Sequence, residues 1–513
     1  MSNPGQWNVS EKVSQCVFPR LDTDRFFEDA DYNAYICRLV DKNIGGFCIF
    51  NGNPEQVEQM IHKLQARTVT PLLMSADFEN GLPMRLTEGT DFPHALGMGK
   101  LSHESVFKIA QAIAKEASGL GIRWNLAPVA DVNTNPDNPV INIRSLGEDA
   151  EQVAQHVKSY IEGTQVEKVL ACAKHFPGHG DTGKDSHFEL PTVIHKLDRL
   201  SFIEFEPFRE AIKTNVASIM LGHLSVPAID DSGIPASLSP KVVSILREDL
   251  LFRGLIVTDA LDMKAITNHY SSEKAAFLAL AAGCDIALMP ENPESVIKFI
   301  TKLAEDDVEF HEKVDIAARR IILYKRKFGL IPQYQLLEEG KNLYINHAKM
   351  ALNYSYEILE KSGVNELIPI PENISFAGFA FVKNDKAFRT ASRFFTMLAQ
   401  ATENDCDFAY INTEIGDDEI KEMQKGIKDT GIIIFALFYR GLSAEERDFE
   451  MAELNRVMDK IATGKKRIVI LFGNPYIKNY LNYDLIVLAY SDSFSSLAAS
   501  VVMLTGREES LKF

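Results

Sequence analysis

The sequence predicts an α/β protein in which a (β/α)8 barrel of the TIM type is followed by a smaller α/β sandwich domain. Short strand-like apolar runs alternate with amphipathic helical patterns from about residue 14 to 330, and about eight such units fit into this stretch. The alternation resumes after the proline-marked boundary at 369–371. A doubly wound open sheet is the alternative for the first part, but no G-x-G-x-x-G fingerprint supports a nucleotide-binding version of it.

The strand candidates of the barrel are short apolar runs with the composition of buried strands. They lie at residues 18–21, which is the weakest of the set, and at 46–51, 71–77, 123–131, 169–176, 217–226, 254–262 and 284–290. Helical patterns separate them at 104–118, 149–162, 200–213 and 272–282. A further helix is predicted from its start signal, because Ser239 suits the N-cap position and Pro240 the first helical position.

The remaining chain predicts a connector and a second domain. A basic helix is expected at 310–327 and a helical connector at 348–362. Strands are expected near 375–382, 408–412, 431–439, 467–472 and 485–490, with a helix at 444–461. We therefore expect the barrel to occupy residues 1–345, a helical linker 346–372 and the small α/β domain 373–513.

Composition narrows the classes of partner. The net charge of −17 argues against nucleic acid or an anionic membrane as the main partner. The six cysteines are scattered without C-x-x-C spacing, the N-terminal residues lack the apolar core of a signal peptide, and no apolar run reaches membrane-spanning length. The expectation is a cytoplasmic protein that acts on a small molecule and associates with neither nucleic acid nor membrane.

Charged and imidazole side chains stand at the carboxyl ends of the predicted strands. They are Asp77, Asp131, Lys174, His175, His223 and Asp259. In a TIM barrel all of these ends open onto one face, where catalytic groups gather. Arg85 and Arg144 lie in loops that follow two of the strands. A site that combines carboxylates, imidazoles and guanidinium groups suits a polyhydroxylated substrate.

The stretch 174–187 is the densest of these regions, with three histidines, two aspartates and two lysines among three glycines. Asp185 lies two residues before His187, close enough for its carboxylate to orient the imidazole and favour its protonated form. A charged Asp259 at the end of a buried strand costs free energy of folding unless its carboxylate is paired with another group or takes part in chemistry. Asp259 could also serve as a helix N-cap. Together these residues fit a two-step retaining glycosidase, in which one group attacks the anomeric carbon and another transfers the proton.

The stretch 174–187 resembles the signature of β-N-acetylglucosaminidases in glycoside hydrolase family 3. Four further segments agree with that family in order and position, namely 77–81 with Arg85, 127–131, 142–145 and 258–263. The resemblance covers about residues 15 to 330, and the second domain is similar to that of two-domain members. Two departures stand out: Asn80 occupies a position where the family usually has glycine, and Ala260 one where aspartate is common.

The resemblance implies a role for each matching residue. Asp259 would be the nucleophile, His187 the general acid/base and Asp185 its orienting partner. The N-acetylglucosamine unit would be held by Asp77, Arg85, Arg144, Lys174 and His175. No cofactor and no metal is implied. In a bacterium the substrate would be cell-wall muropeptides that end in N-acetylglucosamine, which places the enzyme in peptidoglycan recycling.

Several alternatives remain open. A histidine in place of a carboxylic acid would not repel phosphate, so an N-acetylglucosaminide phosphorylase is one of them. A family 3 β-glucosidase or xylosidase and a non-catalytic muropeptide-binding barrel are two others. The last is a metal-dependent barrel hydrolase, whose ligands would come from His175, His179, Asp181, Asp185 and His187.

Overall fold

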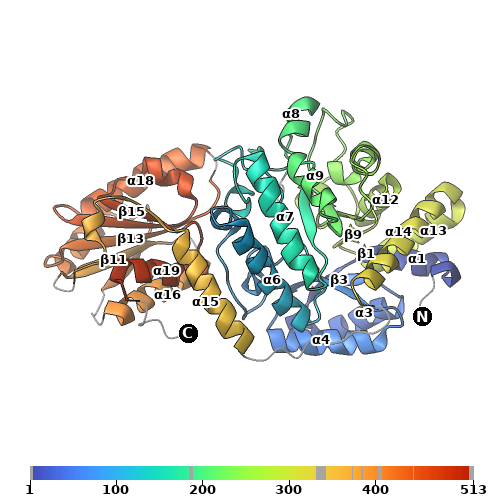
Figure 1. Ribbon diagram of the computed structural model, residues 1–513, viewed down its shortest axis with the longest axis horizontal. Coiled ribbons are helices and arrows are strands. Elements are labelled where there is room, and N and C mark those ends of the chain that lie inside the picture. Colours follow the sequence, from blue (N-terminus) through green and yellow to red (C-terminus); the bar gives the residue numbers. More distant parts are fainter. Residues whose placement is uncertain are drawn as a thin grey trace. The chain divides into compact units, whose positions relative to one another are not determined.

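The computed structural model describes residues 4–183, 189–330, 342–371, 374–382, 385–402, 407–442 and 444–507. The chain forms two compact units (Figure 1). The first unit combines Met1–Thr90, Ser102–Asn135 and Ser145–Lys341, and the second combines Asp91–Leu101, Pro136–Arg144 and Asn342–Phe513. Two short segments from the N-terminal half of the sequence therefore belong to the second unit.

The first unit is a closed barrel of parallel strands. Its strands are β1 (Val17–Phe18), β2 (Arg20–Asp22), β3 (Gly46–Asn51), β4 (Leu73–Ala76), β5 (Trp124–Asn125), β6 (Cys172–Phe176), β7 (Ser218–Leu221), β8 (Leu255–Thr258) and β9 (Ala287–Leu288). The ladders β2-β3-β4-β5, β6-β7-β8 and β9-β1 are joined by parallel bridges between Trp124 and Leu170 and between Val257 and Ile286. Because β1 and β2 share one position around Pro19, the ring closes and the predicted (β/α)8 barrel is confirmed.

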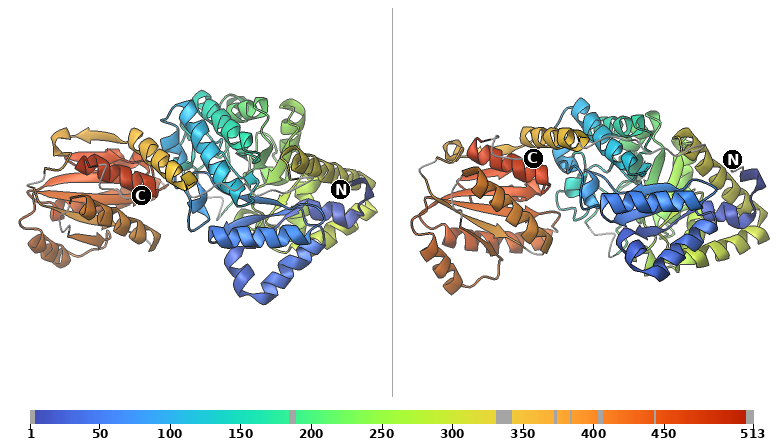
Figure 2. Two further views of the ribbon diagram at one scale, coloured as in Figure 1. Left: turned by 60° about the horizontal axis from the view of Figure 1, so that its bottom comes forward. Right: turned by 90° about the horizontal axis from the view of Figure 1, so that it is seen from below.

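Helices lie around the outside of these strands (Figure 2). They are α1 (Val9–Gln15), α2 (Thr23–Glu28), α3 (Ala30–Asp41), α4 (Pro54–Arg67), α6 (His103–Gly119), α7 (Ala150–Val166), α8 (Leu197–Phe202), α9 (Glu206–Lys213), α10 (Pro240–Ser244), α11 (Lys264–Thr267), α12 (Ser272–Ala282), α13 (Pro293–Asp306) and α14 (Val308–Lys327). Ser239 caps α10 as predicted, since its hydroxyl accepts a hydrogen bond from the backbone N–H of Val242. None of the helices, over the described residues, is long and apolar enough to cross a bilayer.

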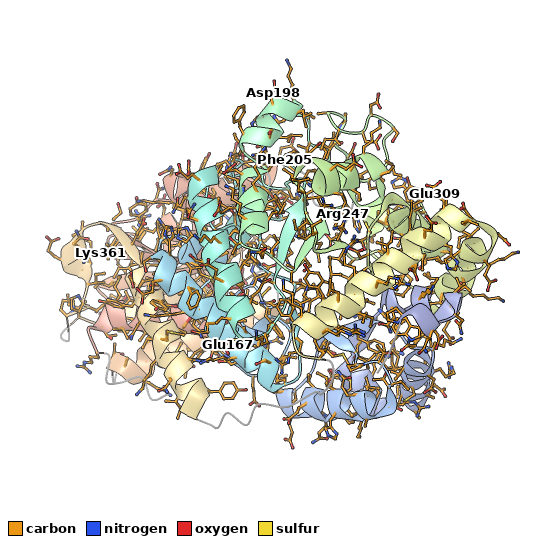
Figure 3. The ribbon with its side chains drawn as sticks, turned by 45° about the vertical axis from the view of Figure 1, so that its right-hand side comes forward. Glu167, Asp198, Phe205, Arg247, Glu309 and Lys361 are labelled. Carbon is orange, nitrogen blue, oxygen red and sulfur yellow. The ribbon has the colours of Figure 1, made fainter. Side chains whose placement is uncertain are left out.

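Two barrel elements differ from the sequence prediction. The helix expected at 200–213 is two helices, α8 and α9, and Phe205 lies between them (Figure 3). Pro207 stands in the first turn of α9, where its missing N–H costs no hydrogen bond, so a new helix begins there. The run 123–131 forms a regular strand only at β5, because Pro128 cannot donate to a ladder and only an isolated bridge at Val129 follows it.

The second unit contains a six-stranded sheet in the order β10-β15-β14-β13-β11-β12. The strands are β10 (Glu360–Gly363), β11 (Phe376–Phe381), β12 (Phe408–Ile411), β13 (Ile432–Tyr439), β14 (Lys466–Gly473) and β15 (Leu485–Leu488). Its helices are α5 (Ala95–Met98), α15 (Asn342–Glu357), α16 (Asp385–Thr402), α17 (Asp417–Gly426), α18 (Ala444–Ile461) and α19 (Phe494–Thr505). The helical connector expected at 348–362 was wrong at its end, since β10 pairs there antiparallel with β15.

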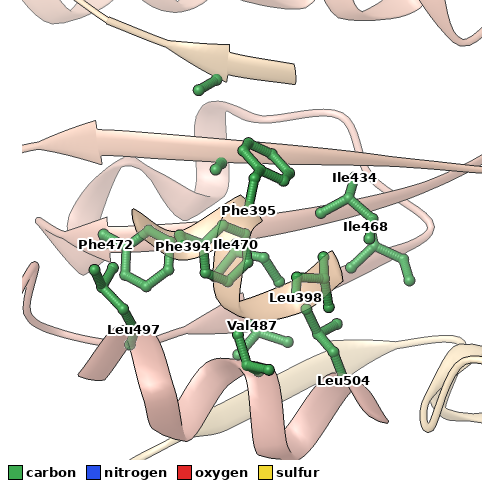
Figure 4. Packing of buried hydrophobic residues seen from close by; sticks show 14 of the residues in the cluster. Phe394, Phe395, Leu398, Ile434, Ile468, Ile470, Phe472, Val487, Leu497 and Leu504 are labelled. Atoms are coloured by element: carbon green, nitrogen blue, oxygen red, sulfur yellow. The ribbon is translucent and has the colours of Figure 1, made fainter. Parts of the chain in front are cut away.

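The core of this unit lies between the sheet and the helices α16 and α19. Phe394, Phe395 and Leu398 from α16 and Leu497 from α19 pack on branched strand residues, as Figure 4 shows. The Phe394 and Phe472 rings meet edge to face with centroids 5.2 Å apart. Helices α17 and α18 pack on each other and complete the α/β sandwich that the sequence predicts.

Candidate active site

The carboxyl ends of the barrel strands carry the charged side chains that the sequence analysis singled out. Asp77 directly follows β4, Lys174 and His175 belong to β6, and Asp259 directly follows β8. Parallel strands of a barrel open their carboxyl ends onto one face, so these four residues share one end of the first unit. Contacts form one group around Asp77 and a second group around Asp131, while the side chain of Asp259 is held by the backbone N–H of Ala260.

Lys174 is the centre of the first group. Its side chain is buried. Nζ donates a hydrogen bond to Asp77 Oδ1 at 2.8 Å and also lies 2.8 Å from Glu79 Oε1. Arg85 Nη2 donates to the other oxygen, Asp77 Oδ2, at 2.7 Å. Burial alone would raise the pKa of Asp77, but Lys174 and Arg85 hold it well below its ordinary value. The group therefore presents fixed charges of both signs at neutral pH.

Asp131 organises the second group. Both of its carboxylate oxygens accept hydrogen bonds from the backbone N–H of His175 at 3.2 Å, and Oδ2 accepts from His175 Nδ1 at 2.8 Å. The backbone N–H of His179 donates to Oδ1 at 2.7 Å. Since the carboxylate only accepts, Nδ1 of His175 carries the proton, and the orientation of the ring is fixed. Burial opposes the charge of Asp131, but His175 keeps its pKa below the ordinary value.

Asp259 is an ionised carboxylate with one oxygen disengaged. Its Oδ1 accepts a hydrogen bond from the backbone N–H of Ala260 at 2.8 Å, and the described residues offer no hydrogen bond to Oδ2. Burial alone would raise the pKa of Asp259, but His175 and then His223 hold it below the ordinary value. Nucleophilic attack requires a negatively charged oxygen that is not engaged in a hydrogen bond.

His223 supports the backbone beside Asp259. Its Nε2 donates a hydrogen bond to the carbonyl oxygen of Ala260 at 2.8 Å, and Nδ1 lies 2.7 Å from the hydroxyl of Ser237. A carbonyl can only accept, so Nε2 of His223 carries a proton and is the donor in this hydrogen bond. Asp259 is thereby fixed both by the strand and by this side-chain contact.

The predicted acid/base pair Asp185 and His187 lies outside the described residues. The chain on either side of it is held together, because Asp181 forms an ion pair with His195 and lies 3.2 Å from Arg199 Nη2. Arg199 also pairs with the buried Glu204 at 2.7 Å. The roles assigned to Asp185 and His187 therefore stay predictions.

Arg144 is the one described residue of the predicted site that the structure groups apart from the others. It ends a short 3-10 helix, Asn142–Arg144, which belongs to the second unit. Its backbone N–H donates to the carbonyl oxygen of Ile141 at 2.6 Å. Its assignment to sugar binding stays a prediction.

Three residues near the site were not assigned to it from the sequence. Asp131 and His223 were recognised only as strand-end residues, and Glu79 only as part of a motif. The signal that would have found the first two is the strand-end position itself, which they share with Asp77 and Asp259. No comparable signal exists for Glu79, because its contact with Lys174 depends on which strands are neighbours.

The candidate metal ligands are engaged in other contacts where the structure describes them. His175 Nδ1 donates to Asp131, Asp181 pairs with His195, and His179 Nδ1 lies 2.7 Å from the hydroxyl of Thr182. Over the described ranges, no three His, Cys, Asp or Glu side chains come together in a metal-binding arrangement. Asp185 and His187, the other two candidates, lie outside those ranges.

Comparison with known proteins assigns the first unit to a family. Residues 8–323 match the pattern of the glycosyl hydrolase family 3 N terminal domain. Beta-hexosaminidase A of Pseudoalteromonas piscicida is 36% identical over 274 residues, which cover 48% of this chain and 46% of the relative. A beta-N-acetylglucosaminidase/beta-glucosidase of Cellulomonas fimi is 30% identical over 321 residues, which cover 60% and 56%. The chain thus spans about half the length of these curated relatives.

A solved structure extends the similarity to both units. The glycoside hydrolase family 3 beta-N-acetylglucosaminidase from Paenibacillus sp. str. FPU-7 aligns with a TM-score of 0.83 and 26% sequence identity, covering 98% of this chain and 97% of that one. A beta-glucoside phosphorylase aligns with a TM-score of 0.81 at 20% identity, which establishes likeness of fold alone. The two-unit architecture therefore has known counterparts over almost its whole length.

Proposed function

Because this chain belongs to glycosyl hydrolase family 3, we propose that it is an exo-acting β-N-acetylhexosaminidase that removes terminal, non-reducing, β-linked N-acetylglucosamine. The relatives named as beta-hexosaminidases and the Paenibacillus beta-N-acetylglucosaminidase support this activity. The observation that carries the proposal is the state of Asp259. Its carboxylate stands at a strand end, has a lowered pKa and leaves Oδ2 without a hydrogen bond from the described residues.

Asp259 acts as the nucleophile in this proposal. Oδ2 attacks the anomeric carbon, the bond to the leaving oxygen breaks, and a covalent glycosyl-aspartate forms with inverted configuration. Water then attacks the same carbon and releases the sugar with net retention. His175 and His223 favour the anionic form of Asp259 and so keep it ready for the first step.

The group around Lys174 positions the sugar. Asp77 has a carboxylate that accepts hydrogen bonds from hydroxyl groups, while Lys174 and Arg85 supply donors beside it. Because these three residues already hold one another, little side-chain entropy is lost when a sugar binds. His175 completes the set of first-unit residues proposed to contact the N-acetylglucosamine unit, and the assignment of Arg144 to sugar binding rests on the family resemblance alone.

Proton transfer is assigned to His187, oriented by Asp185, on the basis of the family resemblance. The imidazolium protonates the leaving oxygen in the first step, and the neutral imidazole accepts a proton from water in the second. For the natural substrate we propose muropeptides that end in N-acetylglucosamine, which places the enzyme in peptidoglycan recycling in the cytoplasm. The bacterial relatives named as beta-hexosaminidases support a glycan substrate.

The test is hydrolysis of p-nitrophenyl β-N-acetylglucosaminide compared with the β-glucoside. We expect preference for the N-acetyl sugar, no effect of a chelator, and a fall in kcat of about 10⁴-fold in Asp259→Asn. A 5-fluoro glycosyl fluoride of N-acetylglucosamine should label the wild type at Asp259, as peptide mass spectrometry would show. Equal activity in Asp259→Asn, or a label on another residue, would refute the assignment.

The same assay separates hydrolysis from phosphorolysis and tests the proton donor. In phosphate buffer we expect free N-acetylglucosamine as the product. Predominant formation of the sugar 1-phosphate would show that the enzyme is a phosphorylase and not a hydrolase. His187→Ala should abolish activity on the natural glycan, because its leaving group needs protonation. Wild-type activity in His187→Ala would show that another residue is the general acid/base.

A further inference from the structure

The sheet of the second unit has one point at which the chain reverses the direction of strand addition. From β11 the chain passes through α16 to β12 at one edge, and it then returns past β11 to add β13, β14 and β15 on the other side. In open parallel sheets, ligands bind beyond the carboxyl ends of the strands at such a reversal. The topology therefore marks the carboxyl ends of β11 and β13 as the place where a ligand site is expected.

A cavity of about 410 Å³ lies at this place. Phe381 and Tyr439, which line it, are the last residues of β11 and β13. The rest of the described lining comes from Val382, from the turn formed by residues 412–414 after β12, and from Glu450 in α18. This volume falls in the range of small-molecule sites, so the cavity and the topology point independently to the same location.

Some polar side chains of the cavity are held by hydrogen bonds within the protein, and others are available to a ligand. The hydroxyl of Tyr439 donates to Glu450 Oε1 at 2.8 Å, which orients that carboxylate. Asn412 Oδ1 accepts from the backbone N–H of Glu414 at 3.0 Å, which shapes the turn. Within the part of the chain that the structure describes, no side chain pairs with the carboxylate of Glu414 or the hydroxyl of Thr413. These groups are therefore open to a ligand.

The two carboxylates determine the class of ligand. A phosphate or carboxylate group would stand beside Glu414 and Glu450 and be repelled, whereas hydroxyl groups donate hydrogen bonds to them. Val382, which is partly exposed, adds an apolar contact for the C–H face of a sugar ring. We propose that the cavity at the carboxyl ends of β11 and β13 binds a saccharide that carries no acidic group. This site is built from the second unit and does not depend on hydrolysis in the barrel.

The experiment is calorimetric titration of the full chain with N-acetylglucosamine, with glucose 6-phosphate as the acidic control. We expect two sugar sites in the wild type, and the double variant Glu414→Ala/Asn412→Ala should lose one of them or weaken it at least tenfold. Both substituted side chains are exposed, so folding should be preserved, and an unchanged melting temperature verifies this. Glu422→Ala, an exposed carboxylate on α17 outside the cavity, is the matched control and should bind as the wild type does.

The outcomes separate this proposal from the one for the barrel. Loss of one site with unchanged hydrolysis of the aryl N-acetylglucosaminide supports the cavity site. A single site that survives the double variant, or glucose 6-phosphate bound as well as N-acetylglucosamine, overturns it. A protein that binds sugar in the cavity but hydrolyses no glycoside would refute only the proposed function.

Discussion

Two lysines of the first unit are buried to nearly the same degree, but their surroundings differ. Lys174 in β6 is 2% exposed, and its Nζ lies 2.8 Å from carboxylate oxygens of both Asp77 and Glu79. Lys325 in α14 is 0% exposed, and its Nζ donates to the neutral amide oxygen of Gln15 at 2.8 Å. The two carboxylates of Asp77 and Glu79 therefore compensate the charge of Lys174, whereas only the amide dipole of Gln15 faces the amine of Lys325.

The difference shows how this protein keeps a charge in its interior. Burial lowers the pKa of Lys325 to about 7, whereas Lys174 and Arg85 hold the pKa of Asp77 well below its ordinary value. A buried ion pair is not needed for stability, since apolar residues can replace it at little cost. We infer that the charges around Lys174 serve binding and that Lys325 destabilises the fold most strongly below about pH 7.

Removing the compensated lysine should have the largest effect. Lys174→Met removes the cation that contacts both Asp77 and Glu79. We expect kcat/KM to fall by at least about 10³-fold and the free energy of unfolding to fall by about 3–5 kcal/mol. Aryl glycoside kinetics and urea unfolding measure the two effects. The control Lys213→Met removes a largely exposed lysine that pairs with Glu210 and should change neither, and an active Lys174→Met variant would contradict the inference.

Removing the uncompensated lysine should have the opposite effect on stability. Lys325→Met replaces a buried amine by an apolar side chain of similar length and leaves Gln15 without one partner. We expect the free energy of unfolding to rise by about 2–4 kcal/mol at pH 6, with activity unchanged. Urea unfolding measures this, and Lys327→Met, an exposed lysine of the same helix, should be neutral. A destabilised Lys325→Met variant would show that the amine has a structural role.

Asp131→Asn tests whether the contact with His175 contributes to the proposed activity. The substitution removes the negative charge beside His175 but keeps one oxygen that can accept from Nδ1, so the ring of His175 is held less firmly. We expect kcat/KM for the aryl N-acetylglucosaminide to fall by about 10–100-fold. The control Asp149→Asn changes an exposed helix cap and should leave kcat/KM unchanged. A wild-type kcat/KM in Asp131→Asn would contradict a role for this contact.

The gain from Lys325→Met should also depend on pH. The pKa of Lys325 is about 7 in the folded protein and 10.5 in the unfolded chain, so the unfolded chain binds more protons between these values. The wild type therefore becomes more stable as pH rises through this window, and the gain from Lys325→Met should shrink by about 1.4 kcal/mol per pH unit. Unfolding of both proteins at pH 6, 7, 8 and 9 checks this. A gain that is constant over the series would refute the lowered pKa.

Much of the fold was predictable because apolar periodicity records which residues face a core. The run at 46–51 is β3, and the helix expected at 272–282 is α12. The elements that escaped prediction depend on interruptions or on distant partners. The break at Pro207 divides a periodic pattern that reads as one helix, and β10 is a strand because β15 offers it an open edge.

The sequence by itself determined the β/α alternation and the residues that end the strands, Asp77, Lys174 and Asp259 among them. Both are local properties, since they depend on periodicity and on position along the chain. Only the tertiary structure decided that Lys174 meets Asp77 and Glu79 and that Asp131 holds His175. These contacts join residues far apart in the chain, and they form because closure of the barrel makes particular strands neighbours.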